Sequence, residues 1–412
     1  MAKPLSIAII IDDFFPSSGG IGRSVQTQLE ELTRLGHKVT LVAPDRHLEK
    51  PRLASVIECP TVYLEGTSAH LSVLHCNEYR ARLISERDRW DIVHSQTDRG
   101  ALVLASRISR LQRIPHVHTF HANISGTHET LPLVSLFGTL GYEAAISPAL
   151  AWAARRSKKT KPGLIFKRSD LKLAERFDWR NFARIANLVD AFTVPSQFMF
   201  DHIAEFSTEK VNGYVIPTGY NRGIKKAIDE TPRERDDNKV RFLSIGRLAK
   251  EKRLDVLVTA FRKAAIPNSE LVFVGDGDQR DLLLKLSHGA ENIDFRGHLR
   301  DLKAMAYELV NSDALVLSSY RFDSQGLVIS EAVAAGLPVV YCDDRLSTGI
   351  SDKSSLLTTP DVDGLASGMQ QMADPLIRAE YARHTRDLID SVSPEYTAKK
   401  YLQVYYSLLR SN

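Results

Sequence analysis

The feature that most constrains the fold is the alternation of short apolar runs with longer segments of helical periodicity. The run Ser6–Ile11 is followed by apolar residues spaced three or four apart, as on one face of a helix. These residues are Ile21, Val25, Leu29, Leu32 and Leu35. Gly36 is well placed to end that helix, and Lys38–Ala43 is the next expected strand. Repeated strand–helix units predict a parallel sheet with helices on both faces.

The alternation occurs in two halves of the chain. In the first half the further expected strands are Asp91–His94, Pro115–Thr119, Asp190–Pro195 and Gly213–Ile216. In the second half they are Val240–Ile245, Leu271–Gly275, Asn292–Phe295, Asp313–Ser318 and Pro338–Tyr341, with a helix over Arg253–Ala265. We therefore expect an α/β protein with two doubly wound halves. Ligands of such sheets lie beyond the carboxyl ends of the strands, so we expect a ligand in a cleft between the halves.

The charged segment Asn221–Asn238, which Pro232 interrupts, breaks this rhythm and predicts a linker. We assign residues 1–221 to an N-terminal domain, 222–238 to the linker and 239–393 to a C-terminal domain. The length of 412 residues suits two domains.

The composition is that of a soluble globular protein, with 43% hydrophobic and 25% charged residues. The three cysteines are far apart and odd in number. This argues against a disulfide framework or a zinc site and favours a reducing, cytoplasmic location. The apolar run near the N-terminus is followed at once by Asp12 and Asp13 without a small-residue cleavage site, so we interpret it as a buried strand rather than a signal peptide.

Two glycine-containing loops follow expected strands. Gly20 lies in Gly-Gly-Ile-Gly at the start of the first helix, where free backbone N–H groups suit an anion. A tight turn without a ligand is an equal alternative, and the spacing is not that of a dinucleotide fingerprint. In the second loop, the segment 275–278 (Gly-Asp-Gly-Asp) is interpreted as a turn and a helix N-cap.

Two cations, Arg247 and Lys252, follow the first strand of the second half. Fixed cations at this edge can stabilise the negative charge that a departing diphosphate develops, without a metal. The alternative is a solvated basic turn.

Two carboxylates, Asp323 and Glu331, lie eight residues apart around Gly326. We expect Asp323 in a loop and Glu331 in the following helix, with the N–H groups of Gly326, Leu327 and Val328 free to bind phosphate. The carboxylates can each bind hydroxyls, one on a sugar and one on a ribose. The alternative is a helix-capping acid with an incidental glutamate.

Three histidines, His116, His118 and His121, accompany one expected strand. No carboxylate or cysteine joins them at ligand spacing, so a structural role is preferred and no metal is expected.

The order of these motifs resembles glycosyltransferase family 4, whose members are retaining enzymes of GT-B architecture. The resemblance covers residues 7 to about 409 and includes the segments 16–20, 215–219, 246–252, 275–277 and 334–339, the His121 element and the paired acids. It implies a nucleotide-sugar donor, no cofactor, and a last helix (within residues 394–412) that returns to the first domain.

The resemblance also assigns roles by position. Gly20 matches the N-domain glycine that touches the donor, and His121 matches a histidine near the sugar. Arg247 and Lys252 match the diphosphate pair, and Glu331 matches the ribose-binding acid. The backbone phosphate grip falls on Gly326, Leu327 and Val328.

This sequence departs from the family at two positions. Asp323 stands where a glutamate usually holds the donor sugar, and its side chain is shorter by about 1–1.5 Å. Gln325 stands where an aromatic residue is common. Together with Thr218, it is similar to the branch that makes glycosyl diacylglycerols.

Basic charge is concentrated in one segment. Residues 155–180 contain ten Lys/Arg and three acids, a net charge of +7, whereas the whole chain has +4 and the remainder therefore −3. The segment includes Arg155, Arg156, Lys158, Lys159 and Lys161, and it follows the apolar stretch 131–154. We predict peripheral binding to an anionic membrane, on its inner face, with Trp152, Phe166 and Trp179 at the interface. The alternative is a packed apolar segment beside a solvated loop; no motif supports nucleic-acid binding.

We therefore predict a retaining hexosyltransferase that moves a sugar from a nucleotide diphosphate sugar, UDP being the commonest family choice, to a lipid or glycolipid. The alternatives are a soluble or polysaccharide acceptor, a phosphorylase or epimerase on the same architecture, and a non-catalytic sugar-nucleotide-binding protein. The oligomeric state is not fixed by the sequence.

Overall fold

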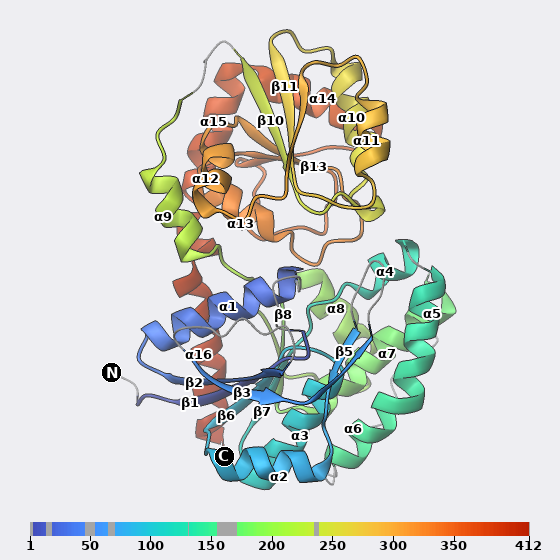
Figure 1. Ribbon diagram of the computed structural model, residues 1–412, viewed down its shortest axis with the longest axis vertical. Helices are drawn as coiled ribbons and strands as arrows, with labels where there is room; N and C mark the ends of the chain where they lie inside the picture. Colours follow the sequence, from blue (N-terminus) through green and yellow to red (C-terminus); the bar gives the residue numbers. More distant parts are fainter. Residues whose placement is uncertain are drawn as a thin grey trace. The chain divides into compact units, whose positions relative to one another are not determined.

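The computed structural model describes residues 3–13, 19–45, 54–64, 71–130, 132–154, 171–234 and 239–411. The chain forms two compact units (Figure 1). Unit 1 comprises Met1–Pro217 with Thr397–Asn412, and unit 2 comprises Thr218–Tyr396. Each has the parallel sheet that the strand–helix alternation predicted.

Unit 1 contains a seven-stranded sheet in the order β3-β2-β1-β6-β7-β8-β9, in which every pairing is parallel. Its strands are β1 (Ser6–Ile10), β2 (Lys38–Pro44), β3 (Ser55–Cys59), β6 (Ile92–Ser95), β7 (His116–Thr119), β8 (Ala191–Val194) and β9 (Gly213–Val215). A separate antiparallel pair is formed by β4 (Thr61–Leu64) and β5 (Leu71–Leu74).

The helices of unit 1 follow the strands as expected for a doubly wound sheet. They are α1 (Gly19–Arg34), α2 (Glu78–Arg87), α3 (Gly100–Gln112), α4 (Ile124–Thr130), α5 (Pro132–Gly141), a π-helical turn η1 (Tyr142–Ile146), α6 (Ser147–Ala154), α7 (Leu173–Leu188) and α8 (Gln197–Phe206). The last helix, α16 (Pro394–Ser411), contributes Tyr401 and Tyr405 to the core of unit 1.

Successive side chains of β1 point to opposite faces of the sheet, so this one strand packs against the helices on both faces. Ile7 and Ile9 pack with α1 and α16 on one face of the sheet, whereas Ala8 and Ile10 pack with α2 and α3 on the other. All four side chains are fully buried, so the uninterrupted apolar run is a central parallel strand. Gly20 is the second residue of α1, the helix that follows β1 in the chain.

Unit 2 contains a six-stranded parallel sheet in the order β12-β11-β10-β13-β14-β15. The strands are β10 (Val240–Ile245), β11 (Ser269–Val274), β12 (Ile293–Gly297), β13 (Ala314–Leu317), β14 (Val339–Tyr341) and β15 (Ser355–Leu357). The helices are α9 (Arg222–Glu230), the 3-10 turn η2 (Lys250–Lys252), α10 (Leu254–Ala264), α11 (Arg280–Leu286), α12 (Leu302–Val310), α13 (Leu327–Ala334), α14 (Val362–Ala373), α15 (Pro375–Arg386) and the 3-10 turn η3 (Ile389–Val392).

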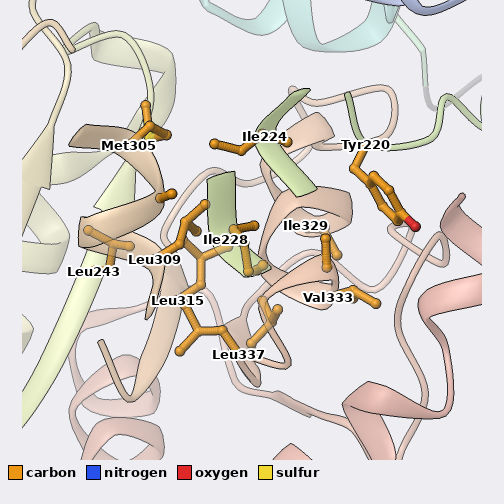
Figure 2. Packing of buried hydrophobic residues seen from close by; sticks show 14 of the residues in the cluster. Tyr220, Ile224, Ile228, Leu243, Met305, Leu309, Leu315, Ile329, Val333 and Leu337 are labelled. Atoms are coloured by element: carbon orange, nitrogen blue, oxygen red, sulfur yellow. The ribbon is translucent and has the colours of Figure 1, made fainter. Parts of the chain in front are cut away.

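One boundary differs from the sequence prediction. Residues 222–230, which we expected in a linker, form α9. Asn221 caps this helix through its side chain, and the buried Ile224 and Ile228 face α12 and α13 (Figure 2). The high charge of the segment lies on the other face of an amphipathic helix, which is why composition alone indicated a linker.

The membrane-interface role that we expected for Trp179 is wrong. This side chain is fully buried, packs against Phe182 and donates from Nε1 to Ser125 Oγ at 3.1 Å. Trp152 is 47% exposed, with the Arg107 guanidinium 5.0 Å from its ring, and Phe166 lies outside the described residues. Within the described part of the chain, no helix is long and apolar enough to span a bilayer.

Candidate active site

The candidate residues of unit 2 lie at one edge of its sheet. Arg247 and Lys252 follow β10, and Asp323 and Glu331 follow β13. Because β10 and β13 are adjacent and parallel, their carboxyl ends meet at the same edge. The topology therefore brings two cations and two carboxylates from distant parts of the sequence to neighbouring loops.

Close backbone approach shapes this edge. Gly246 and Gly275 directly follow the adjacent strands β10 and β11, with φ values of 153° and 143°. A Cβ atom at Gly275 would lie 1.9 Å from the carbonyl oxygen of Gly246. In the same turn, a Cβ atom at Gly277 would lie 2.3 Å from the carbonyl oxygen of Leu248. Only glycine allows these loops to pack, and the packing fixes the path of the loop that carries both cations.

The segment 275–278 forms the expected turn but not the expected N-cap. Asp276 accepts a hydrogen bond from the N–H of Gly277 at 2.8 Å. The N-cap of α11 is Gln279, one residue beyond Asp278, and its side chain makes no capping bond.

Lys252 and Asp323 form an ion pair, with Lys252 Nζ 2.5 Å from Asp323 Oδ1. Ser319 Oγ donates to the other carboxylate oxygen, Oδ2, at 2.5 Å. Ser318 Oγ donates to the backbone carbonyl of Lys252 at 2.7 Å, which ties the two loops together. Lys252 Nζ also lies 5.6 Å from the centre of the Phe322 ring. The structure thus brings Lys252 and Asp323, which the sequence analysis singled out separately, into direct contact.

The environment keeps Asp323 ionised. Burial acts to raise the pKa of this carboxyl, but the Lys252 ammonium and the hydrogen bonds from Lys252 and Ser319 outweigh it and hold the pKa below its ordinary value. The pair is therefore a true ammonium–carboxylate contact with little exposed surface: the Lys252 side chain is 25% exposed and that of Asp323 is 15% exposed.

Arg247 also has a carboxylate partner. Its guanidinium pairs with Glu251, four residues further along the chain, and its side chain is 56% exposed. Each of the two cations that we assigned to the diphosphate is thus engaged by a carboxylate of the same unit.

The α13 segment has the geometry expected of a phosphate-binding helix start. Gly326 is the N-cap residue with φ 72°, a left-handed conformation that favours glycine. Leu327 and Val328 form the first turn, and Glu331 is the fifth residue of the helix. The first N–H groups of a helix have no acceptor within the helix, so those of this turn are available to an anion.

The side-chain amide of Gln325 forms hydrogen bonds with the protein backbone at this edge of the sheet. It is 3% exposed; its Oε1 accepts from the N–H of Thr218 at 2.8 Å, and its Nε2 donates to the carbonyl of Thr218 at 2.6 Å. The two residues that indicated the lipid-glycosylating branch are therefore in direct contact. The amide holds the first residue of unit 2 against the loop before α13 and leaves no polar atom of Gln325 for a ligand.

In unit 1, His121 follows β7 and ends a chain of buried amides. His121 Nε2 lies 2.9 Å from Gln96 Oε1, and Gln96 Nε2 donates to Gln28 Oε1 at 2.8 Å. Gln28 Nε2 in turn donates to Tyr405 OH at 2.9 Å and lies 3.2 Å from His94 Nδ1. Because the amide oxygen of Gln96 can only accept, His121 Nε2 carries the proton and Nδ1 presents a lone pair.

The other two histidines of this strand have structural partners. Ser95 Oγ lies 2.8 Å from both His116 Nε2 and His118 Nδ1, and His118 Nε2 lies 2.9 Å from Asp98 Oδ1. Both rings are buried. Among the described residues, no group of three or more His, Cys, Asp or Glu side chains is placed to hold a metal ion.

Comparison with known proteins decides the family. Residues 18–223 match the model of Glycosyltransferase Family 4, and residues 225–372 match the model of Glycosyl transferases group 1. The chain belongs to glycosyltransferase family 4. It is a hexosyltransferase of GT-B architecture, as the motif order predicted.

The curated relatives of this family 4 glycosyltransferase include two alpha-monoglucosyldiacylglycerol synthases. That of Streptococcus pneumoniae is 23% identical over 99% of this chain and 87% of its own, and that of Acholeplasma laidlawii is 24% identical over 84% of this chain and 83% of its own. Among solved structures, sucrose-phosphate synthase from Thermosynechococcus elongatus superposes with a TM-score of 0.69, covering 99% of this chain and 100% of its own at 18% identity. An Anabaena protein in complex with UDP and glucose gives 0.66, covering 98% and 100% at 15% identity.

Two features of the glycosyltransferase were missed at the sequence level. Ser319, which holds Asp323, and Gln96, which orients His121, have ordinary sequence surroundings. Their positions next to expected strand ends, at the ligand edge of each sheet, were the available signal. The five basic residues assigned to a membrane or acceptor role, Arg155, Arg156, Lys158, Lys159 and Lys161, lie outside the described residues.

His121 gives a prediction for pH dependence. Burial lowers its pKa from 6.5 to about 4, so the folded protein keeps this ring neutral where the unfolded chain binds a proton. The stabilising effect is complete above pH 6.5 and is lost as the pH falls toward 4. We expect His121→Gln, which retains a donor for Gln96, to reduce the proton uptake on unfolding by about one between these limits.

Urea unfolding at a series of pH values measures this proton uptake. His288→Gln, at an exposed position after α11, is the matched control and should leave the pH dependence of unfolding as in the unsubstituted protein. An unchanged pH dependence in His121→Gln would show that His121 is protonated in the folded state as readily as in the unfolded chain.

Proposed function

We propose that this glycosyltransferase moves a hexosyl group from a UDP-sugar to a membrane lipid or glycolipid with retention of anomeric configuration. The observation that carries the donor part is the placement of Arg247 and Lys252 in the β10–α10 loop next to the N-terminus of α13. Cations and free N–H groups at one sheet edge are the donors that bind a diphosphate.

In the proposed reaction, the bond between the anomeric carbon and the diphosphate oxygen breaks, and the acceptor hydroxyl oxygen bonds to the same carbon from the same face. The proton of that hydroxyl passes to the departing phosphate oxygen. Arg247 and Lys252 stabilise the charge that develops on the diphosphate, so their effect is largest in the transition state. Glu331 binds the ribose hydroxyls, and the neutral His121 presents Nδ1 as an acceptor to the sugar.

UDP is supported as the donor nucleotide by the Anabaena structure, which holds UDP and glucose on the same fold. The lipid acceptor is supported by the two relatives that are named alpha-monoglucosyldiacylglycerol synthases. The contact between Gln325 and Thr218 adds to this support, because these were the two positions that resembled the lipid-glycosylating branch.

A lipid acceptor requires a surface that can approach a bilayer, and α5 provides one. Four large apolar residues at helical spacing point outward: Leu133 is 70% exposed, Leu136 42%, Phe137 71% and Leu140 57%. We call these four residues the α5 stripe. Helices of soluble domains normally turn such a stripe toward the core.

The opposite face of α5 shows that this orientation is fixed. Thr139 is buried and donates from Oγ1 to Asp178 Oδ2 at 2.8 Å. His128 Nε2 lies 2.7 Å from the same carboxylate oxygen. The helix therefore directs its small polar side chains inward and its large apolar side chains outward, which suits an apolar partner such as the acyl region of a membrane.

Charge favours an anionic membrane as that partner. The chain continues from α6 into the basic residues Arg155, Arg156, Lys158, Lys159 and Lys161. Each basic residue near an anionic lipid surface contributes about 1 kcal/mol. The proposed location is accordingly peripheral, on the cytoplasmic face of the membrane.

The double variant Leu133→Asp/Phe137→Asp tests the α5 stripe. Withdrawing two such side chains from an apolar layer costs about 3–6 kcal/mol, so we expect vesicle binding to weaken at least about a hundredfold. The measurement is sedimentation with phosphatidylglycerol-containing vesicles. The matched control is Leu282→Asp/Leu376→Asp, at exposed leucines of α11 and α15 (44% and 81% exposed), and it should bind as the unsubstituted protein does. Equal binding to neutral and anionic vesicles would remove the electrostatic part of the proposal.

The proposed function is tested by mass spectrometry of products. The purified protein is incubated with a lipid extract and, separately, with UDP- and GDP-linked hexoses. A lipid whose mass rises by one hexose with a UDP donor is the expected product. Donor binding without any glycosylated lipid, or transfer only to a soluble or polysaccharide acceptor, would overturn the acceptor assignment.

A further inference from the structure

Both carboxylate oxygens of Asp323 are already hydrogen-bonded within the protein. Its Oδ1 receives the ammonium of Lys252 and its Oδ2 receives the hydroxyl of Ser319, both at 2.5 Å. The side chain is one methylene shorter than glutamate, so the carboxylate stays against the loop that bears it instead of projecting away. Its charged partner at hydrogen-bonding distance is the Lys252 ammonium.

We propose, resting on the proposed function, that Asp323 acts on the diphosphate through Lys252, competing with the nucleotide for the ammonium. In this arrangement the Asp323 carboxylate and the donor diphosphate bind the same Lys252 ammonium, so the diphosphate must share or displace the carboxylate. Asp323 is thus a positioning residue that lowers the affinity for the nucleoside diphosphate and speeds its release after transfer.

The electrostatics support this competition. The Lys252 side chain is only 25% exposed, so water screens its interactions less than those of a surface lysine. A nucleoside diphosphate brings about three negative charges to the same group, and a carboxylate within hydrogen-bonding distance of Nζ repels them. Ser319 holds the carboxylate in place, so it cannot simply rotate away from the incoming phosphates.

The pairing of Arg247 with Glu251 shows that the second cation is similarly engaged. The two residues of that pair are four positions apart in the sequence and the arginine side chain is more than half exposed, so solvent weakens the pair. The partly buried Lys252–Asp323 pair is therefore the one whose rupture has a measurable effect on nucleotide affinity.

The experiment is isothermal titration calorimetry with UDP, and with GDP in parallel, on Asp323→Asn and Asp323→Ala. We expect each variant to bind UDP about tenfold more tightly than the unsubstituted protein, which is about 1.4 kcal/mol. In steady-state assays, KM for the donor and kcat should fall together, because tighter product binding slows release. The matched control is Asp363→Asn, which removes the carboxylate of the exposed Lys263–Asp363 pair in the same unit and should leave UDP affinity unchanged.

A double-mutant cycle separates action through Lys252 from a general effect of charge. In a Lys252→Met background, Asp323→Asn should change UDP affinity less than twofold. An equal tightening in that background, or unchanged or weaker UDP binding in Asp323→Asn itself, would overturn the inference. Weaker binding of UDP-sugar with unchanged binding of UDP would return Asp323 to a direct sugar contact. Failure of the unsubstituted protein to bind either nucleotide would overturn the proposed donor and this inference with it.

Discussion

Replacing Lys252 with alanine is expected to lower the rate of sugar transfer by about a thousandfold while the protein stays folded. Removing one preorganised hydrogen-bond donor to a developing anion slows a reaction by about 10²–10³-fold. Here the group removed is the Lys252 ammonium, which also carries a full positive charge opposite the leaving diphosphate. The fold should survive, because Lys252 lies at the end of η2 and contributes no apolar side chain to the core of unit 2.

The matched control for this variant is Lys250→Ala, in the same turn. Lys250 is exposed, and the structure gives it no contact with Asp323 among the described residues. We expect its replacement to change transfer less than twofold, with the circular dichroism spectrum of the folded protein unchanged in both variants. Near wild-type transfer by Lys252→Ala would remove the diphosphate role from this residue.

Replacing Gly275 with alanine is expected to destabilise unit 2 by about 3–5 kcal/mol, which lowers the melting temperature by roughly 8–15 °C. The new methyl group would lie 1.9 Å from the carbonyl oxygen of Gly246, and backbone cannot yield as a flexible side chain does. A positive φ of 143° adds strain. Any relaxation moves the loop that carries Arg247, so nucleotide binding should weaken as well.

Gly289→Ala is the control that isolates the clash. Gly289 also has a positive φ, 79°, but a Cβ atom there would meet nothing within 4 Å. We expect a cost of about 1 kcal/mol from backbone strain alone. Differential scanning calorimetry compares the two variants. Equal destabilisation would mean that close approach between β10 and β11 is not what requires glycine.

The sequence predicted the repeated strand–helix pattern well because buried parallel strands are short uninterrupted apolar runs. The expected strand Val240–Ile245 coincides with β10, and the predicted parallel sheets are both present. Strands such as β3 (Ser55–Cys59) and β15 (Ser355–Leu357) were missed because they lie at sheet edges, where partly exposed residues interrupt the apolar run.

The order of the motifs along the chain predicted which strand ends carry the candidate site, but not the side-chain packing around it. The meeting of Lys252 and Asp323, 71 residues apart, followed from strand ends that share an edge. The burial of Trp179 did not follow, because its helix α7 carries charges on one face that masked an apolar opposite face. Nor did the amide chain from His121 to Tyr405, since Gln28 and Gln96 are recognised as partners only once α1 and α16 are packed.

The central claim is tested most directly by the nuclear magnetic resonance spectrum of the product. The protein is incubated with a UDP-α-linked hexose and with vesicles that contain diacylglycerol as the acceptor. The account predicts an α-linked glycolipid formed in equal amount with UDP, and formation of that glycolipid about a thousandfold slower with Lys252→Ala. A β-linked product, or donor that is bound and consumed without glycosylation of the lipid, would contradict it.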